Sequence, residues 1–274
     1  MTKYIKDTGG VSLSFSIITP VYNRADCISR CIKSVIKNRH GNEDLEHIIV
    51  DDGSKDNTSE IIQGYSEKYS HINFIRFPQN RGTNAARNAA IKASTGKFCI
   101  ILDSDDYFVD DAIQRIKNVI QEHPNNKHYL FAPNDMLPKY ENNILLKGHK
   151  SRTLSFADFL SGSICGDFIH VVCTDIMKQY PFDETLRIYE GVFFMRFYKE
   201  AKRILFTKNI VTIRERSRAD SVTRDTFRVS TQVIDRTIKA TELFILWFKM
   251  IVSNWAFCRF YIAITKFWLT ICCS

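Results

Sequence analysis

The sequence predicts an α/β fold in which a mostly parallel sheet is sandwiched between helices. Short apolar runs rich in β-branched and aromatic residues alternate four times with stretches of helical periodicity in the first half of the chain. This alternation is typical of parallel strands joined by helices that cover both faces of one sheet. The chain has 274 residues, 45% of them hydrophobic, which is enough for one core and an appendage.

The expected elements follow from local patterns. Residues 15–19 form a β-branched run that ends at Pro20, and a helix is expected after Asp26, where apolar residues recur at helical spacing. Three more apolar runs are predicted as strands: 47–50, 73–77 and 98–102. Helices are expected after residue 57, at 82–94 and after residue 110. Beyond residue 125 the pattern is weaker, with strands predicted at 129–132, 143–146, 171–173 and 204–206, and a short helix at 156–160.

Charge and cysteine content limit the classes of function. The formal net charge of +8 and the pI of about 9.0 indicate an anionic partner, which is nucleic acid, a phosphorylated substrate or a membrane surface. The eight cysteines show no zinc-type spacing, and Cys27, Cys31 and Cys99 are expected in the core of a protein in a reducing cytosol. The N-terminus has no apolar signal region, so secretion by that route is not expected.

Three carboxylates follow the apolar run 98–102 directly: Asp103, Asp105 and Asp106. The ends of buried strands in open α/β sheets are where ligands bind. Carboxylates this close repel one another, and a hard divalent cation such as Mg²⁺ or Mn²⁺, bridging to phosphate oxygens, relieves that repulsion. The alternative is that they cap the following helix or lie on a solvated turn.

Four blocks of sequence carry a family resemblance: residues 19–24 (TPVYNR), 50–56 (VDDGSKD), 80–88 (NRGTNAARN) and 102–106 (LDSDD). In this order and context they resemble the nucleotide-sugar glycosyltransferases of family 2, which have the GT-A fold. The resemblance covers residues 15–108. It implies an inverting transferase that uses a nucleotide diphosphate sugar and a divalent metal, Mn²⁺ or Mg²⁺.

The resemblance also implies roles for single residues of the donor site. Asp52 accepts the imide N–H of a uracil ring, and Thr19, Pro20 and Tyr22 form the wall around the base. Arg24 or Arg87 reaches toward phosphate, although Arg87 is equally well read as a surface residue of an alanine-rich helix. The remaining donor and metal ligands lie in the acidic run, with Asp103 and Ser104 facing the ribose or sugar, Asp105 shared between donor and metal, and Asp106 on the metal.

An inverting displacement needs one general base near the acceptor hydroxyl. The family supplies it from an acidic pair in the second half, and Glu190 occupies that position before the apolar run 192–195. The common Glu-Asp pair is Glu190-Gly191 in this chain, so Asp183 and Glu184 are kept as alternatives. A helix-capping role is the competing interpretation of Glu190.

The last third of the chain changes character twice. Arg214, Arg216 and Arg218 are predicted to hold the phosphates of an acceptor, the alternative being a solvated face. Residues 241–274 are aromatic and basic, and cations interrupt any apolar span of about twenty residues. An amphipathic helix lying on the membrane surface fits this pattern best, the alternative being a helix that packs on protein.

These patterns divide the chain into a loose tail (1–14), a nucleotide-sugar-binding half (15–125), an acceptor-binding half (126–240) and the C-terminal segment (241–274). By analogy with the family, the protein is expected to transfer a hexose, glucose or galactose, from a UDP donor. The expected acceptor is an N-acetylhexosamine on polyprenyl diphosphate, in bacterial O-antigen or surface polysaccharide synthesis. The expected location is cytoplasmic, peripheral on the inner face of the cell membrane. The sequence leaves the sugar, the linkage and the oligomeric state open.

Two other classes fit the sequence less well. A nucleotidyltransferase is expected to carry a glycine- and lysine-rich phosphate loop near the N-terminus, and residues 19–24 do not form one. A nucleic-acid-binding protein is suggested by charge alone, since no groove-reading helix or RNA-binding signature is visible, and no nucleic-acid partner is expected.

Overall fold

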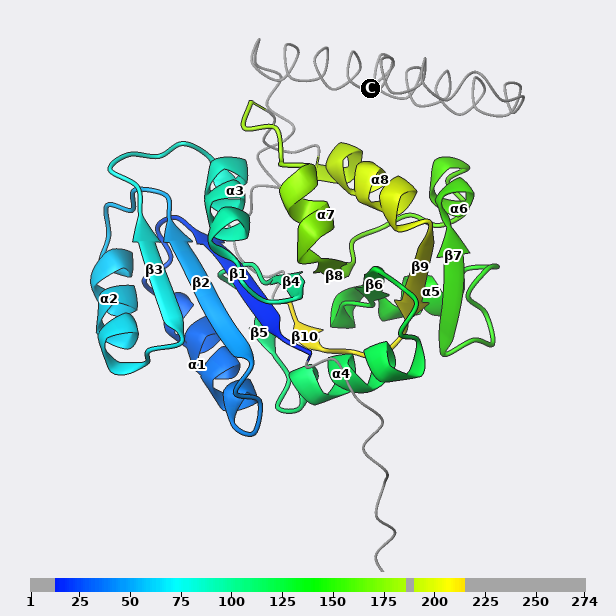
Figure 1. Cartoon of the computed structure of the whole chain (residues 1–274), viewed down its shortest axis with the longest axis horizontal. Helices are drawn as coiled ribbons and strands as arrows, with labels where there is room; N and C mark the ends of the chain where they lie inside the picture. Colours follow the sequence, from blue (N-terminus) through cyan, green and yellow to red (C-terminus); the bar gives the residue numbers. More distant parts are fainter. Residues whose placement is uncertain (1–12, 186–189, 215–274) are drawn as a thin grey trace, which may run out of the picture.

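A central sheet organises the molecule, and four of its strands in a row are parallel. The computed structural model describes residues 13–185 and 190–214 (Figure 1). The parallel strands are β3 (Ile72–Arg76), β2 (Leu45–Asp51), β1 (Phe15–Val21) and β4 (Phe98–Ile101). The sheet continues through β8 (Ile169–Cys173), β6 (His128–Phe131), β9 (Arg203–Thr207) and β7 (Ser151–Ser155). Of these, β8 and β7 run antiparallel to their neighbours, so the sheet is mostly parallel, as predicted.

Helices cover both faces of the sheet, because side chains of one strand alternate between two apolar clusters. Ile17 and Ile49 point to one face and Ile18 and Ile48 to the other. The first face packs against α1 (Ile28–Arg39), α2 (Thr58–Lys68) and α4 (Ala112–Glu122). The second packs against α3 (Thr83–Ala93), α5 (Leu137–Glu141), α6 (Phe156–Leu160), α7 (Thr174–Gln179) and α8 (Glu190–Ala201). In Figure 1, α3, α7 and α8 lie above the sheet, and α1 and α4 lie below it.

A small second sheet brings the last described residues back to the chain that follows β4. Strand β5 (Tyr107–Phe108) pairs antiparallel with β10 (Thr212–Ile213), and Tyr107 lies opposite Ile213. The short 3-10 helix η1 (Asn134–Met136) lies close to β10. The chain that follows β4 is therefore paired with the last residues that the structure describes.

The structure corrects one predicted element and adds six that were not predicted. Residues 143–146, predicted as a strand, form turns, because the Asn143 side chain accepts from Leu145 N at 2.9 Å and its carbonyl accepts from Leu146 N at 3.0 Å. Local bonds of this kind compete with strand pairing. The elements not predicted are β5, η1, α5, β7, α7 and β10. Ser14, the last residue of the predicted tail, is bonded to the sheet, since its carbonyl accepts from Phe98 N at 3.1 Å.

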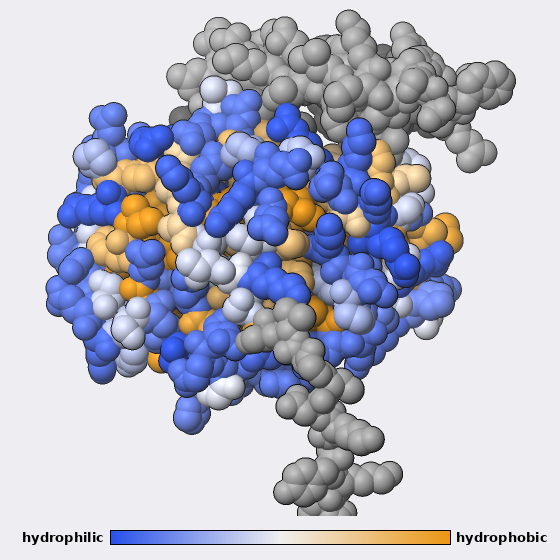
Figure 2. Space-filling model, viewed as in Figure 1, coloured by the Kyte–Doolittle hydropathy of each residue, from blue (hydrophilic) through white to orange (hydrophobic). Residues whose placement is uncertain are grey.

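The surface that Figure 2 turns to the viewer is mainly hydrophilic, with apolar residues in separate patches. Within residues 13–185 and 190–214, none of the helices has the length and apolar character that crossing a membrane requires. The C-terminal segment 241–274, predicted to bind a membrane surface or pack on protein, lies outside the described residues.

Candidate active site

The predicted donor-site residues gather at the carboxyl ends of β2, β1 and β4, which lie side by side in the sheet. Because these strands are parallel, the loops that follow them meet at one edge. These loops carry residues 22–27, 52–57 and 102–106, which overlap three of the four blocks singled out in the sequence. The fourth block leads into α3 over the neighbouring face. Residues far apart in the chain thus converge on one edge of the sheet, the donor edge.

The loops after β1 and β2 are joined by hydrogen bonds. Asn23 N donates to Ser54 Oγ at 2.8 Å, and Asn23 Oδ1 accepts from Lys55 N at 2.9 Å. Arg24 N donates to Thr58 Oγ1 at 2.7 Å. Asn23 has a φ of 50°, a left-handed conformation that asparagine tolerates. The two loops therefore form one rigid wall of the site, and Arg24, half-buried, donates from Nη1 to Asn23 O within it.

Asp51 and Asp52 are adjacent in sequence and have different partners. Asp51 is fully buried and accepts from Ser54 N at 3.0 Å and from the Ser59 hydroxyl, so it anchors the start of α2. Asp52 is 3% exposed, and its two oxygens accept from the backbone N–H groups of Arg81 at 2.6 Å and Gly82 at 2.9 Å. Burial raises the pKa of the Asp52 carboxyl, against the lowering effect of those two bonds.

The Asp52 carboxylate therefore holds the turn that leads into α3. Each of its oxygens has a further lone pair after these bonds, so the group can still accept from a ligand. The turn is tightly packed beside it. A Cβ added at Gly53, where φ is 74°, would lie 2.7 Å from the backbone carbon of Gln79. Only glycine fits that position without strain.

The three residues predicted to surround a base lie at different depths. Thr19 is fully buried and its hydroxyl bonds His47 Nε2 at 2.9 Å, so it supports the end of β1 from within. Burial lowers the pKa of His47 to about 3, which leaves the ring neutral. Pro20 is also buried, whereas Tyr22 is half-buried. Of the three, Tyr22 has the side chain that can reach a ligand.

Arg87 is held inside the site and is not a surface residue of α3. It is 8% exposed, and its guanidinium lies 5.6 Å from the centre of the Phe182 ring. Its Nη1 donates to Asn84 Oδ1 at 3.4 Å and its Nη2 contacts Asp103 Oδ1 at 3.3 Å. The Asp103 side chain is 52% exposed, so this cation sits beside a carboxylate that is open to a ligand.

The acidic turn, residues 103–106, closes through a bond from Asp106 N to Asp103 O at 3.0 Å. Ser104 and Asp106 are buried and Asp105 is half-buried. No group of three or more histidine, cysteine, aspartate or glutamate side chains in the described chain could hold a metal ion by itself. The residues nevertheless fit Mg²⁺ or Mn²⁺ bound in another way, since such ions are often held by one or two carboxylates, with water and substrate phosphates completing the set.

For the predicted general base, Glu190, the structure describes the backbone position only. Glu190 is the first residue of α8, and its side chain lies outside the described part. The alternatives already have partners. Glu184 pairs with Arg81 Nη2 at 3.2 Å and accepts from Asn88 Nδ2 at 3.1 Å, and Asp183 Oδ1 accepts from Thr185 N at 2.8 Å. These bonds make both alternatives parts of the loop that precedes α8.

Of the three predicted acceptor arginines, the structure describes Arg214, which is paired with two carboxylates. Arg214 binds Asp135 through Nε and Nη2, both at 2.9 Å, and Asp167 at 3.4 Å, with its side chain 12% exposed. It therefore fastens the end of β10 to the chain near η1. Arg216 and Arg218 lie outside the described residues.

Sequence reasoning missed the residues that tie α3 to the loop before α8. Asn88 exchanges two bonds with the Phe182 backbone, both 2.8 Å, and Asn84 Nδ2 donates to Asp183 O at 2.9 Å. Asn84 and Asn88 are four residues apart within α3, which places them on one side of that helix, and Arg81 lies just before the helix begins. That spacing was visible within residues 80–88 and was the available signal.

Comparisons with known proteins found similar glycosyltransferases. Over 111 residues the chain is 39% identical to the poly(ribitol-phosphate) beta-glucosyltransferase of Bacillus spizizenii, which covers 40% of this chain and 18% of the relative. It is 27% identical to the GalNAc(5)-diNAcBac-PP-undecaprenol beta-1,3-glucosyltransferase of Campylobacter jejuni, over 76% of this chain and 66% of the relative. The chain spans about a fifth of the length of the first two curated relatives that it matches.

Two solved structures share the fold. The S. aureus TarS fragment 1–349 in complex with UDP-GlcNAc superposes with a TM-score of 0.64 at 22% identity, over 76% of this chain and 60% of that one. The mannosyltransferase PcManGT of Pyrobaculum calidifontis, in complex with GDP-Man and Mn²⁺, gives 0.62 at 16% identity, over 83% and 64%. At such identities the likeness shows the fold, which is therefore GT-A-like, as predicted.

The family model for "Glycosyl transferase family 2" matches residues 16–180, from β1 through the acidic turn to the end of α7. That span exceeds half of the chain and includes the three loops that meet at the donor edge. The protein belongs to glycosyl transferase family 2.

Proposed function

We propose that the protein is an inverting glycosyltransferase that transfers a hexose, glucose or galactose, from a UDP donor. The observation that carries the proposal is the convergence of Asp52, the Arg87–Asp103 pair and the acidic turn at the ends of parallel strands. Such an edge offers acceptors for a base, a cation for phosphate and carboxylates for a metal, which are the chemical needs of a nucleotide diphosphate sugar.

Each group then has a defined task toward the donor. Asp52 accepts the imide N–H of uracil, Tyr22 lies along the base, and Thr19 and Pro20 support the wall from behind. Arg87 and Arg24 face the diphosphate, and Asp103 and Ser104 face the ribose or sugar. Asp105 and Asp106 would hold the Mn²⁺ or Mg²⁺ ion, which supplies Lewis-acid stabilisation of the leaving diphosphate when it is bound.

Glu190 is the proposed base. It takes the proton of the acceptor hydroxyl as that oxygen forms its bond to the anomeric carbon, while the bond from that carbon to the diphosphate breaks and UDP leaves. The new bond forms on the face opposite the leaving group, which inverts the configuration. Position supports this choice, because Glu190 begins α8, and the loop before α8 is bound to α3 beside Arg87.

The proposed acceptor is an N-acetylhexosamine on polyprenyl diphosphate, in bacterial O-antigen or surface polysaccharide synthesis. The names of two similar proteins support this class, since one name specifies a poly(ribitol-phosphate) and the other an undecaprenol-linked glycan. The net charge of +8 favours an anionic acceptor. Residues 15–125 would bind the donor and 126–240 the acceptor, with Arg216 and Arg218 on its phosphates. The segment 241–274 would rest on the inner face of the membrane.

Calorimetric titration with UDP, with and without Mn²⁺, tests the donor half, and a panel of UDP-, GDP- and dTDP-sugars tests the base. We expect metal-dependent binding that prefers uridine. Absence of nucleotide binding would refute the proposal at its centre. Glu190→Gln should abolish turnover and leave UDP affinity within about twofold, and near-normal turnover in that variant would remove Glu190 from the reaction.

A further inference from the structure

One face of helix α1 is bonded to the backbone of the acidic turn. Three successive carbonyls of that turn accept from α1 or the residue before it. The bonds run from Arg30 Nη2 to Asp105 O at 3.0 Å, from Cys27 Sγ to Ser104 O at 3.7 Å and from Cys31 Sγ to Asp103 O at 3.9 Å. The donors are spaced three and four apart, so they share one side of the helix.

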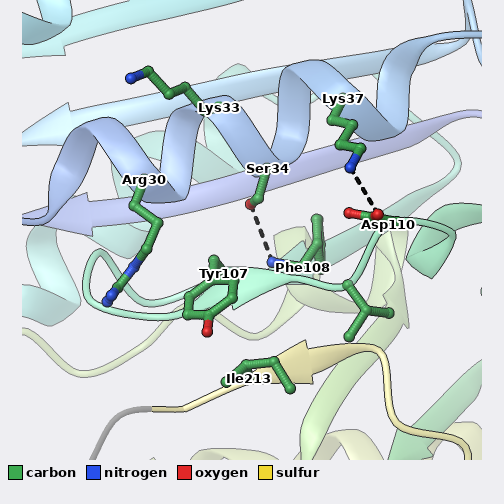
Figure 3. Close-up of a pocket in the computed structure, with 9 residues that line it drawn as sticks. Arg30, Lys33, Ser34, Lys37, Tyr107, Phe108, Asp110 and Ile213 are labelled. Atoms are coloured by element: carbon green, nitrogen blue, oxygen red, sulfur yellow. Dashed lines mark hydrogen bonds and ion pairs between the residues drawn. The ribbon is translucent and has the colours of Figure 1, made fainter.

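The same face continues along the chain that leaves the turn. Ser34 Oγ accepts from Phe108 N at 3.0 Å, as Figure 3 shows. Asn38 is 4% exposed, and its amide donates to Val109 O at 2.8 Å and accepts from Ile113 N at 3.1 Å. The face is thus bonded to the backbone from the acidic turn to the start of α4.

Arg30 is the strongest of these contacts. Its donor is charged, whereas thiols are weak donors. Its guanidinium also lies 4.6 Å from the centre of the Tyr107 ring, which holds it in place from a second side. In Figure 3 the Arg30 side chain descends from α1 beside Tyr107, at one end of a surface hollow of about 460 Å³. Lys33, one turn along the helix, is exposed and is turned away from Tyr107.

Bonds to carbonyls control where the carboxylates lie. Each peptide group is planar, so holding the carbonyls of residues 103, 104 and 105 fixes successive peptide planes. The directions of the Cα–Cβ bonds between those planes follow from them. The backbone that carries Asp105 and Asp106 is therefore set by a rigid helix and not by the ligand, which is the arrangement that precise metal and phosphate binding requires.

We propose that Arg30 is a positioning residue for the acidic turn, which preorganises the carboxylates for the metal and the donor diphosphate. The inference rests on the proposed function of that turn. Arg30 acts through the Asp105 carbonyl and touches neither donor nor metal. Its loss should weaken metal binding in the nucleotide complex more than it weakens the fold, because the other bonds of the α1 face remain.

The test compares three variants of the full chain. Arg30→Met keeps an unbranched stem over Tyr107 and removes the donors, Arg30→Lys keeps a charged donor, and Lys33→Met removes one cation from the next turn as a matched control. Electron paramagnetic resonance of free Mn²⁺ reports the Mn²⁺ affinity of each protein saturated with UDP, without turnover. Thermal unfolding of each protein reports its fold.

We expect Arg30→Met to weaken Mn²⁺ affinity about tenfold, Arg30→Lys to recover part of that loss, and Lys33→Met to stay within twofold of the unaltered chain. Unchanged Mn²⁺ affinity in Arg30→Met, with a lower melting temperature alone, would show that Arg30 only stabilises the fold and would overturn the inference. An equal loss in Lys33→Met would overturn it as well, since net charge would then be the cause. If the unaltered chain bound no UDP at any Mn²⁺ concentration, the proposed function itself would fail.

Discussion

Asp52 accepts from two backbone N–H groups, so we expect its replacement by asparagine to lower the free energy of unfolding more than the same replacement at Asp51 does. In Asp52→Asn, the amide keeps one acceptor oxygen, but its nitrogen then faces a backbone N–H, because both partners, Arg81 N and Gly82 N, are donors. A hydrogen bond to a charged group contributes roughly 1.5–3 kcal/mol, and a buried group left unsatisfied costs about 1–3 kcal/mol. We expect Asp52→Asn to lower the free energy of unfolding by about 2–4 kcal/mol.

Asp51→Asn is the matched control. The Ser59 hydroxyl can change from donor to acceptor, and the remaining amide oxygen can still accept from Ser54 N, so both hydrogen-bond partners stay satisfied. The substitution also removes the ion pair of Asp51 with Arg76 Nε at 3.7 Å, which contributes little because the Arg76 side chain is 55% exposed. We expect a cost of about 1 kcal/mol, mainly from the lost charge. Equilibrium urea unfolding without nucleotide measures both values, provided that the slope with urea stays the same. A cost for Asp52→Asn below about 1 kcal/mol, or one no greater than for Asp51→Asn, would refute the reasoning.

Three further outcomes follow from the structure. Gly53→Ala should cost at least about 2 kcal/mol in urea unfolding, from its positive φ and backbone clash, whereas Gly64→Ala, with open space around its Cβ, should not destabilise. Burial lowers the pKa of His47 and His128 to about 3. The free energy of unfolding therefore has its full value above pH 6.5 and falls as the pH drops toward 3, by up to about 1.4 kcal/mol per pH unit for each ring. His128→Gln should reduce that slope in urea titrations between pH 7 and 5, and an unchanged slope would contradict the assignment. Arg87→Met should weaken UDP binding about tenfold by calorimetry while the melting temperature changes little, because the methionine thioether can take the place of the guanidinium beside the Phe182 ring. Equal affinity would remove Arg87 from the phosphate site.

The donor half of the fold could be predicted from sequence because its signals are local. Three of the parallel strands, β1, β2 and β4, contain short buried apolar runs, and the helices of this half show apolar faces. The second half lacks such signals, since β7 is only intermittently buried and β5 and β10 have two residues each. Strands like these form because partners far along the chain pair with them, and no local pattern records that pairing.

The same distinction applies within the site. The carboxylates after β2 and β4 could be located because they follow buried runs, but the partner that each one takes depends on distant backbone. The pattern gave no sign that Asp51 binds Ser59, or that Asp52 binds the N–H groups of Arg81 and Gly82. Arg87 was ambiguous for a related reason, because only the approach of Phe182 and Asp103 distinguishes it from a surface arginine.

Helix α3 connects the two halves of the proposed reaction mechanically. One part of it presents Arg87 to Asp103 at the donor edge, and Asn84 and Asn88 on the same helix hold the backbone of residues 182 and 183. Phe182 in turn lies under the Arg87 guanidinium and packs against Phe193 and Phe194 of α8. A shift of α3 therefore has to move the donor cation and the helix that begins at Glu190 together. Substitutions at Asn88, which bonds Phe182 and Glu184, should consequently change donor affinity and turnover jointly, whereas a base acting independently of the donor site would show a change in turnover alone.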